Sequence, residues 1–254
     1  MSLYDHPEIY DIVFDGDSRA QQEFLVGCFQ RYARRAVDRV LEPGCGTGRL
    51  LVRLAALGYR VVGVDRNAKA VDYCRERLRR ARLSGSVEVG DMAAMDLSGP
   101  VDAAFNLINT FRHLTSDGAA TAHLRCVAKM LAPGGIYVLG LHLLPEAGRV
   151  SGEEIETRRS GDRIVRSRIW SISIDRLRRE ERIGVAIDVT GPAGRSRIDD
   201  EFVFRTYSWH ELLDVIHRAG GFDLLALHDF DYDLEEATPI EARSEAIVIV
   251  LARR

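Results

Sequence analysis

Three glycines at alternate positions, directly after a short apolar run, constrain this chain more than any other feature. They lie in the stretch Val40-Leu41-Glu42-Pro43-Gly44-Cys45-Gly46-Thr47-Gly48-Arg49-Leu50. Glycine reaches backbone angles that other residues avoid, and its bare main chain lets a flat or bulky ligand approach closely. An apolar run that ends in an acid, followed by such a loop and by leucines at helical spacing, predicts a strand, a nucleotide-type binding loop and a helix.

The rest of the chain alternates between strand-like and helix-like patterns. Strands are predicted at about 38–42, 59–64, 87–89, 101–108 and 136–143, and the helix before the last of these is expected to end at 133–135. Two further strand candidates, 222–227 and 246–251, follow a helix that opens with the capping-box pair Ser208 and Glu211. Such alternation implies a parallel sheet with helices on both faces. The predicted fold is α/β, a doubly wound and mostly parallel sheet of seven strands in a single domain over residues 1–254.

A different rhythm follows the fifth predicted strand. Trp170, Ile172 and Ile174 alternate with polar residues, as do the apolar residues between 183 and 189, and turns are expected near 176–182 and at 191–194. Apolar residues at every second position, which place one apolar face on a strand, indicate an antiparallel sheet. Residues 144–206 are therefore predicted to form an antiparallel insertion that covers the substrate, with an exposed sheet that could also join two copies as a homodimer.

Charge and composition exclude several classes of function. A net charge of −3 argues against a general nucleic-acid binder, which is usually basic over its contact face. The four cysteines are scattered without zinc-ligand spacing, which predicts a reduced chain without a structural metal. No apolar run approaches the roughly 20 residues that span a bilayer, and no targeting segment is recognisable. A cytoplasmic protein that contacts neither membrane nor nucleic acid is expected.

The acid at the end of the second strand narrows the choice of ligand. Asp65 follows the glycine loop by about 20 residues, the position from which a carboxylate accepts hydrogen bonds from ribose hydroxyls. NAD and FAD sites use G-x-G-x-x-G, but here the third glycine, Gly48, comes one residue early and Arg49 takes its place. Glu42 with the three glycines instead fits a nucleoside ligand that carries an ammonium and a carboxylate, and S-adenosylmethionine is such a ligand.

With these residues the chain resembles the class I S-adenosylmethionine-dependent methyltransferases. The resemblance covers nearly the whole length, through 42–49, 62–65, Gly90-Asp91-Met92, 102–114, 131–135 and the final pair of strands. The insertion and the tyrosine-bearing N-terminal arm, 4–17, resemble small-molecule enzymes of this family such as the aminosugar N-methyltransferases. The resemblance implies S-adenosylmethionine as cofactor, S-adenosylhomocysteine as product and a small-molecule methyl acceptor as partner.

The resemblance also assigns roles to individual residues. It places the glycine loop on the methionine part of the cofactor, Asp65 on the ribose, Asp91 on the adenine amino group, Met92 beside the ring and Tyr10 of the arm over the cofactor. The predicted cofactor-binding residues are Tyr10, Glu42, Gly44, Cys45, Gly46, Gly48, Asp65, Arg66, Asp91, Met92, Asn106, Leu107 and Asn109.

Two histidines are candidates for a catalytic base. The methyl group of a sulfonium is already activated, so the site needs mainly to align the acceptor and exclude water. An amine only has to lose its proton, whereas a hydroxyl benefits from a base. His113 follows the fourth strand and His142 ends the fifth, at the edge of the sheet where ligands bind. The alternative for each of them is a hydrogen-bonded structural histidine.

Three other functions compete with methyl transfer to nitrogen or oxygen of a small molecule. An NAD-dependent oxidoreductase is disfavoured by the glycine spacing. A non-catalytic S-adenosylmethionine-binding protein would have the same Gly44, Gly46, Gly48, Asp65 and Asp91. An RNA or protein methyltransferase is disfavoured because no basic domain or Asn-Pro-Pro-Tyr motif is recognisable.

Overall fold

The computed structural model describes residues 2–14, 18–144, 152–235 and 245–254. Its elements, in chain order, are η1 (Leu3–Asp5), α1 (Pro7–Phe14), α2 (Ser18–Tyr32), β1 (Arg39–Pro43), α3 (Arg49–Ala56), β2 (Arg60–Asp65), α4 (Ala68–Ala81), β3 (Gly85–Val89), β4 (Val101–Asn106), η2 (Thr110–His113), α5 (Asp117–Met130), β5 (Leu131–His142), β6 (Glu153–Ser160), β7 (Arg163–Asp175), β8 (Glu180–Gly191), β9 (Gly194–Arg205), α6 (Trp209–Ala219), β10 (Phe222–His228) and β11 (Ala246–Arg253).

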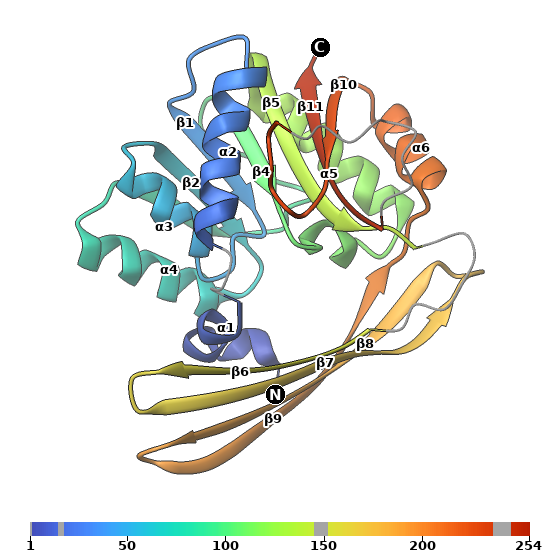
Figure 1. The fold of residues 1–254 in the computed structure, drawn as a ribbon. Helices are drawn as coiled ribbons and strands as arrows, with labels where there is room; N and C mark the ends of the chain where they lie inside the picture. Colours follow the sequence, from blue (N-terminus) through green and yellow to red (C-terminus); the bar gives the residue numbers. More distant parts are fainter. Residues whose placement is uncertain (1, 15–17, 145–151, 236–244) are drawn as a thin grey trace.

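Seven strands form the central sheet, in the order β10-β11-β5-β4-β1-β2-β3 (Figure 1). Neighbouring strands from β3 to β5 pair in parallel, while β11 runs antiparallel to both β5 and β10. The predicted doubly wound, mostly parallel sheet is confirmed, including the final two-stranded hairpin. The order places β1 and β4 side by side, so the loops that follow them meet at the switch point where open α/β sheets bind ligands.

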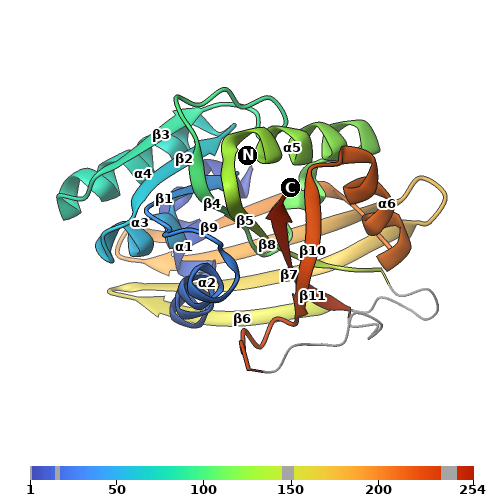
Figure 2. The same ribbon diagram turned by 90° about the horizontal axis from the view of Figure 1, so that it is seen from above.

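Helices cover both faces of this sheet (Figure 2). Because side chains alternate along a strand, β5 sends Ile136 and Val138 into one core and Tyr137 and Leu139 into the other. The first core is shared with α2, α3 and α4, and the second with α5 and α6. The inner strands β4 and β5 are buried on both faces, which explains why they read as continuous apolar runs.

The fifth strand begins earlier than the sequence predicts. β5 starts at Leu131, directly after α5 ends at Met130, whereas the pattern placed the strand from 136 and the helix end at 133–135. Val101 pairs with Leu131 but Ala103 already pairs with Ile136, so the intervening residues form an irregularity in the ladder. Gly134, with a φ of +79°, lies in this irregularity. A bulge rather than a helix end therefore accounts for the Pro-Gly-Gly sequence.

The insertion is a separate antiparallel sheet in the order β6-β7-β8-β9. It follows β5, as predicted, and the chain reverses at 176–179 and 192–193. Neither β6 nor β9 was predicted by itself, and residues 145–151 of the predicted insertion lie outside the described part of the chain. Tyr207, after the insertion, accepts a backbone hydrogen bond of 2.8 Å from Leu144, so the two ends of the insertion lie together.

The small sheet lies below the central sheet in Figure 1, with α1 between them. Its inward side packs on the arm in a third core, which joins Leu3 and Val13 to Val165, Val185 and Ile187. The predicted ordered arm thus consists of η1 and α1, and its residues 15–17 are not described. Within the four described ranges, no helix combines the length and apolar character that crossing a membrane requires.

Candidate active site

The glycine loop is built on left-handed backbone. Gly44, Gly46 and Gly48 have φ values of +65°, +52° and +72°, which side-chain-bearing residues rarely adopt. A Cβ atom at Gly44 would lie 2.5 Å from Cγ2 of Thr110, and one at Gly48 would lie 2.2 Å from Sγ of Cys74. Both the conformation and the packing therefore require glycine, as the alternate spacing predicts.

Asp65 fixes this loop against the second strand. Its Oδ2 accepts a hydrogen bond of 2.7 Å from the Gly46 amide, and its Oδ1 accepts one of 2.8 Å from the Asn67 amide. Burial raises the pKa of Asp65, against the lowering effect of these amides and Arg66. Asn67 itself caps α4 by accepting from Lys69 and Ala70, so Asp65 is not needed as a helix cap. Each carboxylate oxygen keeps a second lone pair that can accept a hydroxyl proton.

Glu42, near the end of β1, has a buried oxygen that no residue in the described part of the chain satisfies. Among the described residues, its Oε2 has no hydrogen-bond partner. Burial raises the pKa of Glu42 well above its ordinary value, and the positive charge of Arg49 only partly opposes this. A buried carboxylate oxygen without a partner costs free energy unless a ligand completes it. An ammonium group is suited to this oxygen because it donates up to three hydrogen bonds and carries the opposite charge.

A cavity of about 920 Å³ opens beside these residues, between the carboxyl ends of the parallel strands, the arm and the small sheet. The predicted residues that line it are Tyr10, Glu42, Gly44, Cys45, Gly46, Asp65, Arg66, Met92, Leu107, Asn109, His113 and His142. Three predicted residues are not in the lining. Gly48 is buried at the start of α3, Asn106 donates a hydrogen bond of 2.5 Å to the Pro43 carbonyl, and the exposed Asp91 accepts one of 2.8 Å from Ala93.

Aromatic rings close the side of the cavity that faces the arm. Tyr4 packs 5.7 Å from Tyr10 and 5.8 Å from Phe202, measured between ring centroids, and its hydroxyl lies 3.0 Å from Nε2 of His113. Burial, together with Arg112 and the nearby charge of Arg66, lowers the pKa of His113 to about 4. The His113 ring is therefore neutral near pH 7, as a proton acceptor must be.

A second polar group lies at the carboxyl end of β5. Asn109 accepts a hydrogen bond of 2.8 Å from the His142 backbone amide, and its Nδ2 lies 2.7 Å from Nδ1 of the same histidine. Arg112 extends from η2 to Glu181 of β8 in a buried ion pair of 2.5 Å. Glu181 and Arg112 both line the cavity, so the core and the insertion share one polar wall.

Several lining residues were missed by reasoning from the sequence, namely Tyr4, Arg112, Trp170, Glu181, Phe202 and Phe204. Most come from the arm and the insertion, far from the glycine loop in the sequence. One available signal was Arg112, a charged residue between Phe111 and His113 in a turn that the loop pattern already placed at the ligand edge.

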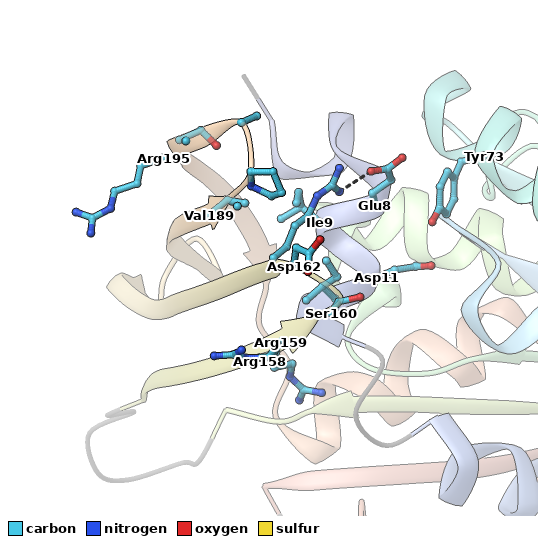
Figure 3. Close-up of a pocket in the computed structure, with 17 residues that line it drawn as sticks. Glu8, Ile9, Asp11, Tyr73, Arg158, Arg159, Ser160, Asp162, Val189 and Arg195 are labelled. Atoms are coloured by element: carbon cyan, nitrogen blue, oxygen red, sulfur yellow. Dashed lines mark hydrogen bonds and ion pairs between the residues drawn. The ribbon is translucent and has the colours of Figure 1, made fainter.

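The chain also has a groove of about 1230 Å³ on the outer side of α1 (Figure 3). Glu8 of α1 forms an ion pair of 2.7 Å with Arg163 of β7 there, and Tyr73 of α4 also lines the groove. None of the predicted site residues lines this groove. In the described ranges, no group of three histidine, cysteine or acidic side chains is arranged to hold a metal ion.

Part of the chain matches a known protein family. Residues 40–135 match the model of the methyltransferase domain. The chain spans about half to three fifths of the length of the first curated relatives it matches. A longer alignment, 25% identical over 85% of both chains, is with the dTDP-4-amino-2,3,4,6-tetradeoxy-D-glucose N,N-dimethyltransferase of Saccharopolyspora spinosa.

Solved structures show the same fold over nearly the whole chain. DesVI of Streptomyces venezuelae is 18% identical, with a TM-score of 0.82 and 98% coverage of both chains. CalS10 of Micromonospora echinaspora, an amino pentose methyltransferase with bound S-adenosylmethionine, is 22% identical, with a TM-score of 0.73 and coverage of 95% and 97%. The domain match over residues 40–135, the shared fold and the glycine loop agree, and in these features the chain is similar to the class I S-adenosylmethionine-dependent methyltransferases.

Proposed function

We propose that this chain transfers a methyl group from S-adenosylmethionine to nitrogen or oxygen of a small-molecule acceptor. The observation that carries the proposal is the unpartnered carboxylate oxygen of Glu42, which lies in the same cavity as the Asp65 carboxylate and the glycine loop. These groups match an ammonium, a pair of ribose hydroxyls and a flat ligand held against bare backbone. The fit requires no phosphate site, which argues against a dinucleotide.

The chain's own residues would bind and align the two substrates. Bound S-adenosylmethionine supplies a methyl group on a positively charged sulfur, which is already activated for attack by a lone pair. Glu42 and Asp65 would hold the cofactor, and Tyr4 and Tyr10 of the arm would exclude water from that side of the cavity. Alignment of two substrates can account for several kcal/mol of the barrier, so no strong acid or base is required.

Nitrogen is the first acceptor atom to test. The relative that aligns over 85% of both chains is named as an N,N-dimethyltransferase of an aminosugar nucleotide, and CalS10 is named as an amino pentose methyltransferase. We propose the same class of acceptor, a small molecule with a primary or secondary amine. The cavity of about 920 Å³ is large enough for a cofactor and a sugar-sized acceptor together.

The small sheet would serve as the wall that selects the acceptor. Its residues Ile169, Trp170, Ile183, Phe202 and Phe204 line the cavity. We propose that residues 1–254 act as one methyltransferase domain, with 144–206 as a lid inserted in it. A homodimer through the outer face of this sheet remains a prediction that light scattering would check.

Calorimetric titration followed by a methylation assay would test the function. S-adenosylhomocysteine should bind with a dissociation constant far below that for NADH, because the unpartnered Glu42 carboxylate can pair with its ammonium and NADH offers no such group. Incubation with methyl-labelled S-adenosylmethionine and dTDP-4-amino-4,6-dideoxy-D-glucose should then yield a labelled amine. Binding of NADH alone would refute the proposal, and binding of S-adenosylhomocysteine without labelling of any amine or hydroxyl acceptor would indicate a non-catalytic binding protein.

A further inference from the structure

We propose that His142 binds an oxygen atom of the methyl acceptor through a permanently fixed Nε2–H donor and does not receive the acceptor's proton. This inference rests on the proposed function, and it reverses the role that the sequence suggests for His142. It follows from the direction of each hydrogen bond in the cluster formed by Asn109, Arg112, His142 and Glu181.

The orientation of the Asn109 amide is settled by its neighbours. The backbone N–H of His142 can only donate, so the Asn109 atom 2.8 Å away must be the carbonyl oxygen Oδ1. Arg112, which also can only donate, lies 3.4 Å from the same oxygen. The amide nitrogen Nδ2 therefore faces the His142 ring, 2.7 Å from Nδ1. Two independent donors exclude the flipped amide.

The amide in turn fixes the proton on the His142 ring. An amide NH₂ group has no lone pair to offer, so Nδ1 of His142 must accept the hydrogen bond. A neutral imidazole then carries its proton on Nε2. Protonation of Nδ1 would bring two hydrogen-bond donors face to face. Burial also lowers the pKa of His142, and the charge of Arg112 lowers it further, whereas the charge of Glu181 raises it. The ring is held neutral, with a single donor.

That donor is available to a ligand. His142 lines the cavity, and its ring packs edge-on against Phe230 at 4.8 Å between centroids. Its Nε2 has no hydrogen-bond partner in residues 2–14, 18–144, 152–235 and 245–254. An N–H group on the cavity wall that lacks a partner among the described residues suits an oxygen acceptor, such as a hydroxyl or carbonyl of the substrate.

The acceptor nitrogen is not a productive partner for this donor. A hydrogen bond from Nε2–H to the amine would occupy the lone pair that attacks the methyl group. The donor would therefore hold a different atom, an oxygen near the amine, and so orient the lone pair. The proton of the amine must leave by another route.

The backbone at Asn109 supports a functional origin for this arrangement. Ile108 and Asn109 have φ values of +52° and +64°, two consecutive left-handed residues without a glycine. Asparagine tolerates this region, but a β-branched isoleucine rarely adopts it. Such strain is typical of ligand sites, and Asn109 is the residue whose side chain contacts the His142 ring.

Ring nitrogen NMR on histidine-labelled protein tests the inference without any acceptor. In the wild type, His142 should show the Nε2–H tautomer and should remain neutral at pH 6.5, where an unperturbed histidine is half protonated. Asn109→Asp is the matched variant, because an aspartate still accepts from the His142 amide but now also accepts from Nδ1. It should give the Nδ1–H tautomer and a higher pKa. The Nδ1–H tautomer or an imidazolium at pH 7 in the wild type would overturn the inference.

Kinetics with dTDP-4-amino-4,6-dideoxy-D-glucose as the probe tests the role in binding. His142→Gln retains a donor near the position of Nε2 but cannot take up a proton, whereas His142→Ala removes the donor. The alanine variant should have a KM up to about tenfold above that of the wild type, with little change in kcat. The glutamine variant should have a KM close to the wild-type value. A fall in kcat of about a hundredfold or more in both variants would identify His142 as a base instead. If the wild type does not methylate the probe, the proposed acceptor class fails, while the NMR result still decides the state of His142.

Discussion

Arg112 and Glu181 form an ion pair of 2.5 Å in which each side chain is only 7% exposed. Arg112 belongs to η2, which follows β4 of the central sheet, and Glu181 belongs to β8 of the insertion. The Arg112 guanidinium also lies 4.7 Å from the centre of the Phe204 ring of β9. The two sheets are therefore joined by a charged contact within the wall of the active site.

Removing one partner of this pair should destabilise the protein strongly. In Glu181→Leu the buried guanidinium of Arg112 loses its counter-charge, and the expected loss is about 3–5 kcal/mol of unfolding free energy, measured by urea titration. The double variant Arg112→Met with Glu181→Leu removes both charges and should recover most of that loss. Equal stability of Glu181→Leu and the wild type would show that the pair does not hold the sheets together.

Glu42→Gln should change stability and cofactor affinity in opposite directions. The affinity for S-adenosylhomocysteine should fall about 10- to 150-fold in calorimetry, because a charge-assisted hydrogen bond of about 1.5–3 kcal/mol is lost. The ligand-free variant should be more stable than the wild type near neutral pH, since it no longer buries an unpartnered carboxylate. Unchanged affinity would remove Glu42 from the cofactor site.

The pH dependence of the ligand-free protein offers a second test of Glu42. Because the pKa of Glu42 is raised in the folded state, folding favours its protonated form. The stability that this proton contributes is complete below the unfolded pKa of about 4.5 and is lost as the pH rises through the folded pKa. Urea titrations over this range should show a downward slope in the wild type that is weaker in Glu42→Gln. An identical slope in both proteins would contradict the assignment.

Asp65→Ala should weaken the binding of S-adenosylhomocysteine by a few kcal/mol at most, the scale of two lost charge-assisted hydrogen bonds. It should also lower the unfolding free energy by about 1–3 kcal/mol, because the amides of Gly46 and Asn67 lose their acceptor. Asn67→Ala is the control, since it removes only the cap of α4, at about 1 kcal/mol, and should leave affinity nearly unchanged. Unchanged affinity in Asp65→Ala would refute the ribose assignment.

Gly48→Ala should lower the unfolding free energy by more than its unfavourable backbone angle alone explains. Gly58→Ala isolates the conformational cost, about 1–2 kcal/mol, because Gly58 has a φ of +96° and open space around it. At Gly48 the new methyl group also meets Cys74, so overpacking should add about 1–3 kcal/mol in urea denaturation. Similar losses in both variants would indicate that the loop relaxes away from α4.

The sequence predicted the parts of the fold that follow from local patterns. Gly44, Gly46 and Gly48 meet a local backbone requirement of the turn that they form, and Asp65 ends an apolar run, so spacing alone located the loop and the end of β2. By contrast, β6 has only one apolar residue, Ile155, and nearly all its residues are exposed, so it has no apolar period that could reveal it. A strand held mainly by its pairing with β7 is visible only once the partner is placed.

The acceptor side of the cavity was predicted less well because it is assembled from distant segments. Tyr4 and Phe202 meet across nearly 200 positions of the chain, and no local pattern specifies that meeting. The hydrogen bonds of His142 show a further limit, because its role depends on which atom of Asn109 faces it rather than on residue type.

The hydrogen bond between Leu144 and Tyr207 holds the two ends of the insertion together, so the insertion is suited to exchange between related proteins. A segment whose two ends meet can be replaced by the corresponding segment of another family member with only two junctions, and the strands that hold the cofactor loop would stay connected as before. Chimaeras joined at these positions would test whether this one contiguous segment determines which acceptor is methylated.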